Sequence, residues 1–160
     1  MPLEAPLAPV AERVADLNAR YRHHGATSVL KHALTDPQVG RVALVSSFGA
    51  ESVVLLHMVS VFDRTTPVLF IDTEMLFDET LTYQEEVAKK LGLADVRILR
   101  PARDQVFDRD PDGILHLAEP DACCTLRKIE PLQDALRPFD PWITGRKRFQ
   151  GGRRETLDFF

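Results

Sequence analysis

The segment from Arg41 to Val61 constrains the fold of this chain more than any other. It reads RVALVSSFGAESVVLLHMVSV, with a short apolar run at 42–45, a turn of small residues at 46–50, and a second apolar run from Glu51. A continuous apolar strand is typical of a parallel sheet that helices cover on both faces. We therefore expect a strand, a tight turn and a helix here, and an α/β fold.

The turn between the two runs is rich in hydrogen-bond donors. Ser46, Ser47 and Ser52 carry hydroxyl groups that add no charge, and Gly49 would let the backbone approach a ligand closely. A helix that begins here would direct its unpaired amides and the positive end of its dipole at the same point. The turn therefore suits an anion, although an ordinary strand-to-helix turn with a serine cap fits the same residues. It is not a Walker loop, because no Gly-Lys-Ser/Thr follows.

The rest of the chain alternates between apolar patterns typical of strands and apolar patterns typical of helices. Further strands are expected at 68–71, 96–99 and 141–144, and helices at 8–21, 27–34, 78–91 and 122–137. Asp121 should cap the last helix, Pro131 should kink or break it near Ile129, and 101–120 reads as irregular. The helix after Glu51 is apolar on most faces, so it should be largely buried, with His57 in the core. These patterns predict one domain over 1–160, with N-terminal helices at 1–40, an α/β core at 41–145 built on an open parallel sheet, and a basic segment at 146–160.

Composition and charge exclude several classes of protein. With 24 acidic and 20 basic residues the net charge is −4, which argues against a general nucleic-acid binder. No stretch is apolar enough to span a bilayer, and the N-terminus lacks the layout of a secretory signal, so we expect a cytoplasmic protein without membrane contact. Five of the 20 basic residues lie in one short segment near the C-terminus, where they suggest a small anionic ligand or a solvated tail: Arg146, Lys147, Arg148, Arg153 and Arg154.

Cys123 and Cys124 are the only cysteines, and they are adjacent. A disulfide scaffold would need more cysteines at wider spacing, and a bridge between neighbours is strained. Metal ligation, redox chemistry and two inert buried thiols remain open, with zinc disfavoured because no second Cys or His pair has zinc-finger spacing. His23, His24 and His32 stand without ligand-type neighbours, so we expect them in surface or capping roles.

Four segments, in this order, resemble the adenylyl-sulfate and phosphoadenylyl-sulfate reductases. They are SSFGAES, similar to the family's modified pyrophosphatase-type loop, IDTEMLFDETLTYQ, CCTLRKIEPL with its tandem cysteines, and the basic WITGRKRFQGGRRETL. The resemblance implies an adenine-nucleotide alpha-hydrolase-like fold of the PP-loop type. It also implies that Cys123 and Cys124 supply two of the four ligands of a [4Fe–4S] cluster. The substrate-binding residues that it implies are Ser46, Ser47, Phe48, Gly49, Ser52, Asp72, Thr73, Arg127, Lys128, Gly145, Arg146 and Arg148.

The resemblance further implies an activity, namely reduction of adenylyl sulfate to sulfite and AMP in assimilatory sulfate reduction and cysteine biosynthesis. A thiolate would attack the sulfur of adenylyl sulfate and release AMP, and thioredoxin would then free sulfite as the electron donor. The expected partners are therefore adenylyl sulfate or AMP and thioredoxin, with a homo-oligomer possible. Tandem cysteines favour adenylyl sulfate over its 3′-phosphorylated relative.

The sequence departs from the family pattern at two places. Glu74 replaces the glycine of an LDTG segment, which puts a substrate contact there in doubt because a carboxylate repels an anion. The family's downstream Cys-x-x-Cys and the nucleophilic cysteine of its Cys-Gly-Leu/Ile-His tail are also missing, so that nucleophile is expected beyond Phe160. We therefore expect the N-terminal portion of a longer reductase or a truncated product, and no activity from these 160 residues alone.

Three other functions remain in view. The chain could be a phosphoadenylyl-sulfate reductase or a module that holds an adenine nucleotide without chemistry. An ATP pyrophosphatase is a further alternative, but Phe48 and Glu51 stand where the ATP-using SGGxDS pattern has glycine and aspartate.

Overall fold

The structure is a computed structural model that describes residues 8–146, 151–152 and 156–160. It divides into two compact units. The first, here called the sheet unit, comprises 41–145. The second, the helical unit, comprises the described residues of 1–40 and 146–160.

The chain alternates between helices and short strands, as the apolar pattern predicts. In chain order the elements are α1 (Val10–Tyr21), α2 (Ala26–Thr35), β1 (Ala43–Val45), α3 (Ala50–Phe62), β2 (Val68–Ile71), α4 (Asp78–Leu91), β3 (Val96–Leu99), α5 (Arg103–Arg109), α6 (Leu115–Ala118), α7 (Pro120–Cys124), the π-helical turn η1 (Thr125–Ile129), α8 (Glu130–Leu136) and β4 (Trp142–Ile143).

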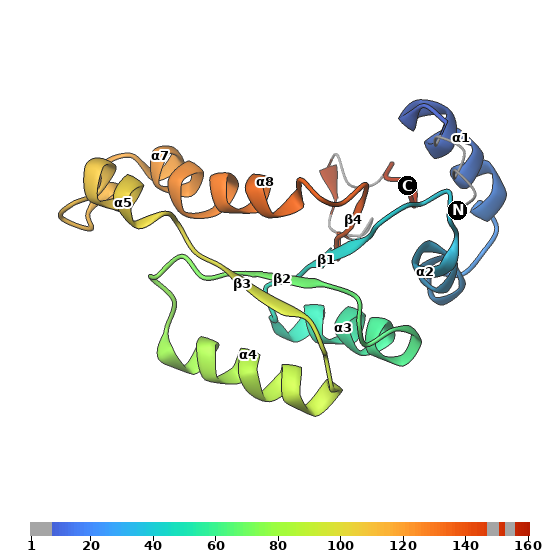
Figure 1. The fold of residues 1–160 in the computed structure, drawn as a ribbon, viewed down its shortest axis with the longest axis horizontal. Coiled ribbons are helices and arrows are strands. Elements are labelled where there is room, and N and C mark those ends of the chain that lie inside the picture. Colours follow the sequence, from blue (N-terminus) through green and yellow to red (C-terminus); the bar gives the residue numbers. More distant parts are fainter. Residues whose placement is uncertain (1–7, 147–150, 153–155) are drawn as a thin grey trace, which may run out of the picture. The chain divides into compact units, whose positions relative to one another are not determined.

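The sheet unit is built on four parallel strands in the order β3-β2-β1-β4. Its register pairs Leu44 with Val68 and Ile143, so β1 lies in the middle between β2 and β4. Helices α3 and α4 cover one face and α8 covers the other, where it packs against β2 and β3 (Figure 1). This confirms the predicted α/β fold with an open parallel sheet.

The core of the sheet unit is formed around the central strands β1 and β2. Leu44 of β1 and Leu69 of β2 are fully buried, as the continuous apolar runs require. Helix α4 ends where Gly92 adopts a left-handed conformation with φ of 65° and donates its N–H back to the last turn. That is the stop expected of glycine after a helix, and it turns the chain toward β3.

Three local predictions were wrong. Residues 101–120 are not irregular, because they contain the short helices α5 and α6. Helix α3 is only partly buried, with Val54 63% and Val61 66% exposed, and His57 is exposed rather than in the core. The helix that carries the cysteines begins at Pro120 without a side-chain cap, so Asp121 does not have the capping role that we expected.

The predicted break near Ile129 takes the form of a π-helical turn. The N–H of Glu130 bonds to the carbonyl of Thr125, five residues back, which widens the helix over Thr125–Ile129. The cause is Pro131, which has no N–H for the carbonyl four residues earlier and whose ring would clash with it. The wide turn therefore separates the cysteines at the end of α7 from the regular helix α8.

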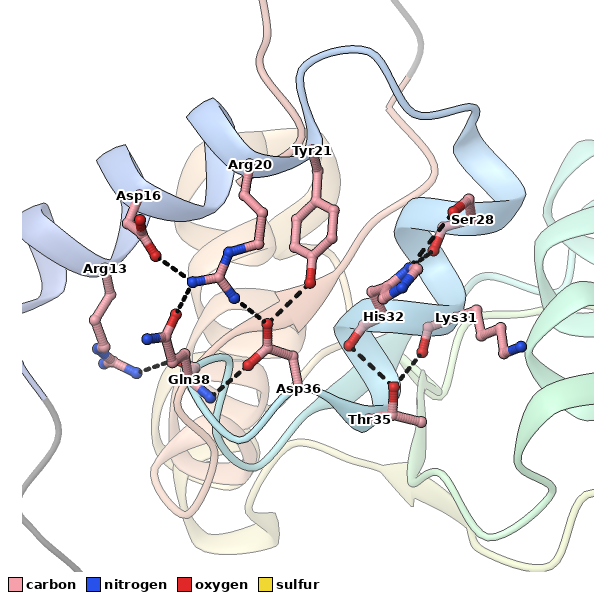
Figure 2. Close-up of polar contacts among 10 residues, drawn as sticks. All are labelled: Arg13, Asp16, Arg20, Tyr21, Ser28, Lys31, His32, Thr35, Asp36 and Gln38. Carbon is pink, nitrogen blue, oxygen red and sulfur yellow. Dashed lines mark hydrogen bonds and ion pairs between the residues drawn. The ribbon is translucent and has the colours of Figure 1, made fainter.

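In the helical unit, Asp36 is the centre of a polar network between α1 and the end of α2 (Figure 2). Its carboxylate accepts hydrogen bonds from the Tyr21 hydroxyl at 2.9 Å, Arg20 Nη1 at 3.0 Å and the Gln38 N–H at 2.9 Å. Burial alone would raise the pKa of Asp36, but the Gln38 N–H, the Tyr21 hydroxyl and the charge of Arg20 together hold it below its usual range. The ionised Asp36 thus ties the two helices together.

The last residue of the chain also belongs to the helical unit. The carboxamide of Asn18 donates to the Phe160 carbonyl at 2.9 Å and accepts from the Phe160 N–H at 3.0 Å. The rings of Phe160 and Tyr21 lie 5.8 Å apart. Asn18 therefore holds both backbone polar groups of Phe160 against α1.

Within the described residues, the longest helices are too short or too polar to cross a lipid bilayer.

Candidate functional site

The carboxyl edge of the parallel sheet gathers most of the residues expected to bind substrate. Strand β2, which follows β1 and α3 in the chain, pairs with one side of β1, and β4 pairs with the other side. Such a reversal of strand order leaves a crevice at the carboxyl ends of the central strands, which is the usual ligand site of open α/β sheets. Ser46 follows β1, Asp72 follows β2 and Thr144 follows β4, so all three loops reach this edge.

The serine loop after β1 is ordered by its own hydroxyl groups. Ser46 is buried, and its Oγ accepts the Phe48 N–H at 3.1 Å, while Ser47 Oγ accepts the Gly49 N–H at 3.4 Å. Ser47 is exposed and its Oγ lies 3.4 Å from Ser52 Oγ in the first turn of α3. Ser46 therefore shapes the loop, and Ser47 and Ser52 present two hydroxyls at one point.

The start of α3 adds backbone donors to the same point. Its N-cap is Gly49, and no side chain caps the helix. A Cβ added to Gly49 would lie 3.5 Å from Ser47 Oγ, an ordinary contact, so the protein itself leaves room for a larger residue. An uncapped helix start next to two hydroxyl groups favours an anion, because both offer donors and the helix dipole is positive there.

Phe48 holds the serine loop to the core. Its φ is 57°, in the left-handed region that disfavours residues with a Cβ. Its ring is 1% exposed and meets the ring of Phe70 edge-on, with centroids 5.5 Å apart. Burial of the two rings offsets the free-energy cost of the left-handed backbone at Phe48. The described contacts of the Phe48 ring are with the core.

The segment after β2 is fixed by side chains from later in the chain. Asp72 is buried, and its two carboxylate oxygens accept the Glu74 N–H and Arg100 Nε, each at 2.9 Å. Thr73 Oγ1 accepts the Met75 N–H at 3.3 Å. Asp72 and Thr73 therefore use their side chains to order this turn, and the ion pair ties it to the end of β3.

Arg127, in the π-helical turn, joins the same segment to the loop after α5. Its Nη1 donates to the Thr73 carbonyl at 2.9 Å and its Nη2 to Asp110 Oδ2 at 2.7 Å. The two side chains of this ion pair are 6% and 1% exposed, and Arg127 Nε is buried without a partner among the described residues. The hydrogen bond from Arg127 and the N–H of Leu115 hold the pKa of Asp110 below its usual range. Arg127 thus supports the loop, whereas Lys128 is exposed.

Glu74 occupies a backbone position suited to glycine. Its φ is 60°, and its side chain is exposed. It lines a pocket of about 270 Å³ together with residues of α5 and the loop that follows, namely Arg103, Val106, Phe107, Asp110 and Pro111. Glu74 therefore adds a carboxylate to this pocket, two residues after Asp72.

Cys123 and Cys124 end α7 directly before the π-helical turn. Cys123 is buried, Cys124 is half-buried, and both are free thiols. The described residues contain no group of three or more metal-ligating side chains. Arg127, four residues after Cys123, has a buried Nε without a partner among the described residues. Two thiols are half of the ligands that a four-thiolate cluster needs, and the 160 residues contain no further cysteine.

The remaining predicted residues follow β4. Gly145 lies beside α3, since a Cβ there would meet Leu55 Cδ2 at 3.8 Å. Arg146 is exposed, and Arg148 lies outside the described residues. Sequence analysis missed Arg100 and Asp110. Arg100 could have been found, because it directly follows a predicted strand and must reach the same edge as Asp72.

Fold and site together define an α/β protein with a serine-rich loop and an uncapped helix start at the switch point of a parallel sheet. A model of the phosphoadenosine phosphosulfate reductase domain matches residues 41–160, and the chain belongs to this family.

Three curated relatives cover between 73% and 94% of the chain. A protein of Mesorhizobium japonicum named adenosine 5′-phosphosulfate reductase is 42% identical over 151 residues, which are 94% of this chain and 59% of that protein. A protein of Chelativorans sp. with the same name is 42% identical over 146 residues, 91% of this chain and 60% of the relative. A Gloeobacter violaceus protein named phosphoadenosine 5′-phosphosulfate reductase is 35% identical over 119 residues, 73% of this chain and 49% of the relative. The chain thus spans about three fifths of the first two relatives.

A solved structure agrees with the fold. The crystal structure of a phosphoadenylyl-sulfate reductase from Candida auris, a phosphate complex, superposes with a TM-score of 0.71. The match covers 89% of this chain and 70% of that one at 22% identity, so it supports the architecture and not the site.

Proposed function

We propose that this chain forms the nucleotide-binding part of a thioredoxin-dependent adenylyl-sulfate reductase. The observation that carries the proposal is the 42% identity, over more than nine tenths of the chain, to two proteins named adenosine 5′-phosphosulfate reductase. The geometry of the serine loop supports it, because Ser47, Ser52 and the start of α3 offer neutral donors to one anionic group.

In the proposed reaction a cysteine thiolate attacks the sulfur of adenylyl sulfate. The bond from sulfur to the phosphate oxygen breaks, AMP leaves with the electron pair, and the enzyme keeps an S-sulfocysteine. A thioredoxin dithiol then reduces this intermediate, which releases sulfite and leaves a disulfide on thioredoxin. Donors aimed at the phosphate stabilise the charge that develops on the leaving AMP, and Ser47, Ser52 and the basic segment from Arg146 would provide them.

The tandem cysteines are proposed as cluster ligands and not as the nucleophile. Cys123 and Cys124 would supply two thiolates to a [4Fe–4S] cluster, and the other two ligands and the nucleophile would come from outside these 160 residues. A bound cluster would add an iron–sulfur centre next to the π-helical turn. Arg127 orients that turn through its bonds to Asp110 and Thr73, whether or not a cluster is present.

Calorimetric titration of the 160-residue chain with AMP and with adenylyl sulfate tests the nucleotide site. Gly49→Ala should leave the chain folded but weaken binding at least tenfold, because the new methyl group lies beside Ser47 Oγ, where the anion would sit. Gly25→Ala is the matched control, since Gly25 is also an extended helix N-cap with room for a Cβ. Unchanged affinity in Gly49→Ala would contradict the assignment of the serine loop.

Two alternatives are separated by the same titrations. Tighter binding of phosphoadenylyl sulfate than of adenylyl sulfate would favour a phosphoadenylyl-sulfate reductase, as in the Gloeobacter relative's name. A module that only holds a nucleotide would bind AMP as tightly as adenylyl sulfate. It would also stay inactive when joined to the segments of the longer relatives that this chain does not span.

A further inference from the structure

We propose that the pocket lined by Glu74 and helix α5 binds a free α-amino acid with an apolar side chain. The pocket belongs to the sheet unit and has a volume of about 270 Å³. It contains none of the residues that the resemblance assigns to substrate, so it is a site separate from the one proposed for the nucleotide. The inference therefore goes beyond the proposed function and does not depend on it.

Two opposite charges line the pocket, and neither has a partner among the described residues. Glu74 and Arg103 form no ion pair with each other or with another described side chain, so their charged atoms lie more than 4.0 Å apart. The third charged residue of the lining, Asp110, is already engaged, because its two oxygens accept Arg127 Nη2 at 2.7 Å and the Leu115 N–H at 2.9 Å. The pocket therefore offers one free carboxylate and one free guanidinium to a ligand.

The backbone of Glu74 points to a role other than fold stability. Its φ of 60° lies in the left-handed region, where a residue with a Cβ is disfavoured. Phe48, the other described non-glycine residue with positive φ, offsets this cost by burying its ring, but Glu74 is exposed. A backbone cost that persists without packing is typical of functional positions, and here it holds a carboxylate at the pocket.

The rest of the lining is apolar. Val106, Phe107 and Pro111 line the pocket together with the charged side chains. Phe107 is 76% exposed, which leaves an aromatic surface that the apolar side chain of a ligand can cover. Pockets for drug-sized ligands have volumes of about 300–1,000 Å³, so a volume of about 270 Å³ suits a smaller molecule.

These features together select a zwitterion. The ammonium group of an amino acid would pair with the Glu74 carboxylate, and its carboxylate would accept hydrogen bonds from the forked guanidinium of Arg103. Its side chain would lie against Phe107. A simple anion would be repelled by Glu74, a simple cation would be repelled by Arg103, and an uncharged apolar compound would leave both charges without a partner.

The test follows the backbone amides of Glu74, Val106 and Phe107 by NMR while the 160-residue chain is titrated with L-leucine. Two analogues each lack one charge, because N-acetyl-L-leucine has no ammonium group and L-leucinamide has no carboxylate. We expect leucine to bind about two- to fivefold more tightly than either analogue, as exposed ion pairs allow, and the preference to shrink at high salt. Glycine, which has no apolar side chain, should bind more weakly than leucine.

Two substitutions assign the contacts. Glu74→Gln should remove the preference for leucine over N-acetylleucine and keep the preference over leucinamide, and Arg103→Gln should do the reverse. A purely structural role would weaken the binding of all three compounds equally. Arg109→Gln and Glu85→Gln, which change exposed residues outside the pocket lining, should leave both preferences unchanged.

If leucine shifts none of the three amides up to its solubility, the pocket does not bind amino acids and the proposal is refuted. It is also refuted if leucine binds but both preferences survive in both variants, or if the unmodified chain binds leucine and N-acetylleucine equally. Titration with AMP reports on the proposed nucleotide site instead. Loss of AMP binding would therefore leave this proposal intact, and failure of the leucine titration would leave the proposed function intact.

Discussion

The left-handed backbone of Phe48 predicts an unusual order of stability among variants at this position. Replacing a buried phenylalanine by alanine costs about 3–5 kcal/mol of unfolding free energy. Glycine normally costs about 0.5–1 kcal/mol more than alanine, because it is more flexible in the unfolded chain. At φ of 57°, however, any residue with a Cβ pays about 1–2 kcal/mol that glycine does not.

The two backbone terms oppose each other, and the strain is the larger. Phe48→Gly should therefore be about 0.5–1 kcal/mol more stable than Phe48→Ala, although both are less stable than the unmodified chain. The free energy of unfolding can be measured by urea denaturation followed by circular dichroism, with equal m-values as the check on comparable unfolded states.

Phe70 supplies the matched control for this comparison, because it belongs to the same ring pair but lies in strand β2. In an extended strand no left-handed strain exists to be relieved, so Phe70→Gly should be about 0.5–1 kcal/mol less stable than Phe70→Ala. The same order at both positions, with alanine above glycine, would refute the claim that the serine loop is held in a strained conformation by its buried ring.

Three further measurements test the site. The hydrogen bond from Arg127 lowers the pKa of Asp110. The contribution of Asp110 to stability is therefore present above the ordinary pKa of aspartate and is lost as the pH falls through the lowered value. Asp110→Asn should make the unfolding free energy, measured by urea denaturation from pH 6 down to 2, depend less on pH. Replacing Arg146 and Arg148 together by glutamine should weaken binding of adenylyl sulfate more at low salt than at high salt, whereas replacing the exposed Arg137, which directly follows α8, by glutamine should have no effect. The 160-residue chain should release no sulfite from adenylyl sulfate with reduced thioredoxin and should retain no stable [4Fe–4S] cluster after anaerobic reconstitution, and turnover by this chain alone would show that the nucleophile is misassigned.

The strands and the main helices could be predicted because their signals are local. Val68–Ile71 is an apolar run, Val96–Leu99 is apolar except for Arg97, and the structure reproduces both strands with the same bounds. The segment 78–91 has acidic residues in its first turn and a glycine after its last, which fix both ends of α4. The position of the break near Ile129 also followed from one residue, Pro131, although its π-helical form did not.

The errors arise where structure depends on distant partners. Helices α5 and α6 are short, with seven and four residues, and too short for a helical period to stand out. The composition of α3 gives no polar face, so the sequence could not show that Val54 and Val61 are left exposed. Which residues of such a helix are buried depends on the elements that pack against it. The spacing of apolar residues along the sequence does not identify those elements.

In the candidate site, too, local features could be predicted from the sequence and contacts between distant residues could not. The serine loop could be recognised because its hydroxyls and its glycine lie within seven residues of one another. The ion pair of Arg127 with Asp110 spans 17 residues and its bond to the Thr73 carbonyl spans 54, so neither has a local pattern. Sequence reasoning assigned Arg127 to substrate binding, and that role stays a prediction, whereas the structure shows its guanidinium bonded to the protein itself.

Arg100 and Arg127 form ion pairs within the protein, so positive charge for an anionic substrate would have to come from other residues. The two ion pairs at the edge of the sheet unit cancel their own charges, and Glu74 and Arg103, of opposite charge, line one pocket. The edge therefore offers an anion neutral donors at the serine loop and little net positive charge. Neutral hydrogen bonds are not screened by salt, so the salt dependence of binding should come from the segment that begins at Arg146. If strong salt dependence survives the loss of Arg146 and Arg148, it must come from other exposed cations, such as Arg100, whose side chain is 55% exposed beyond its bond to Asp72.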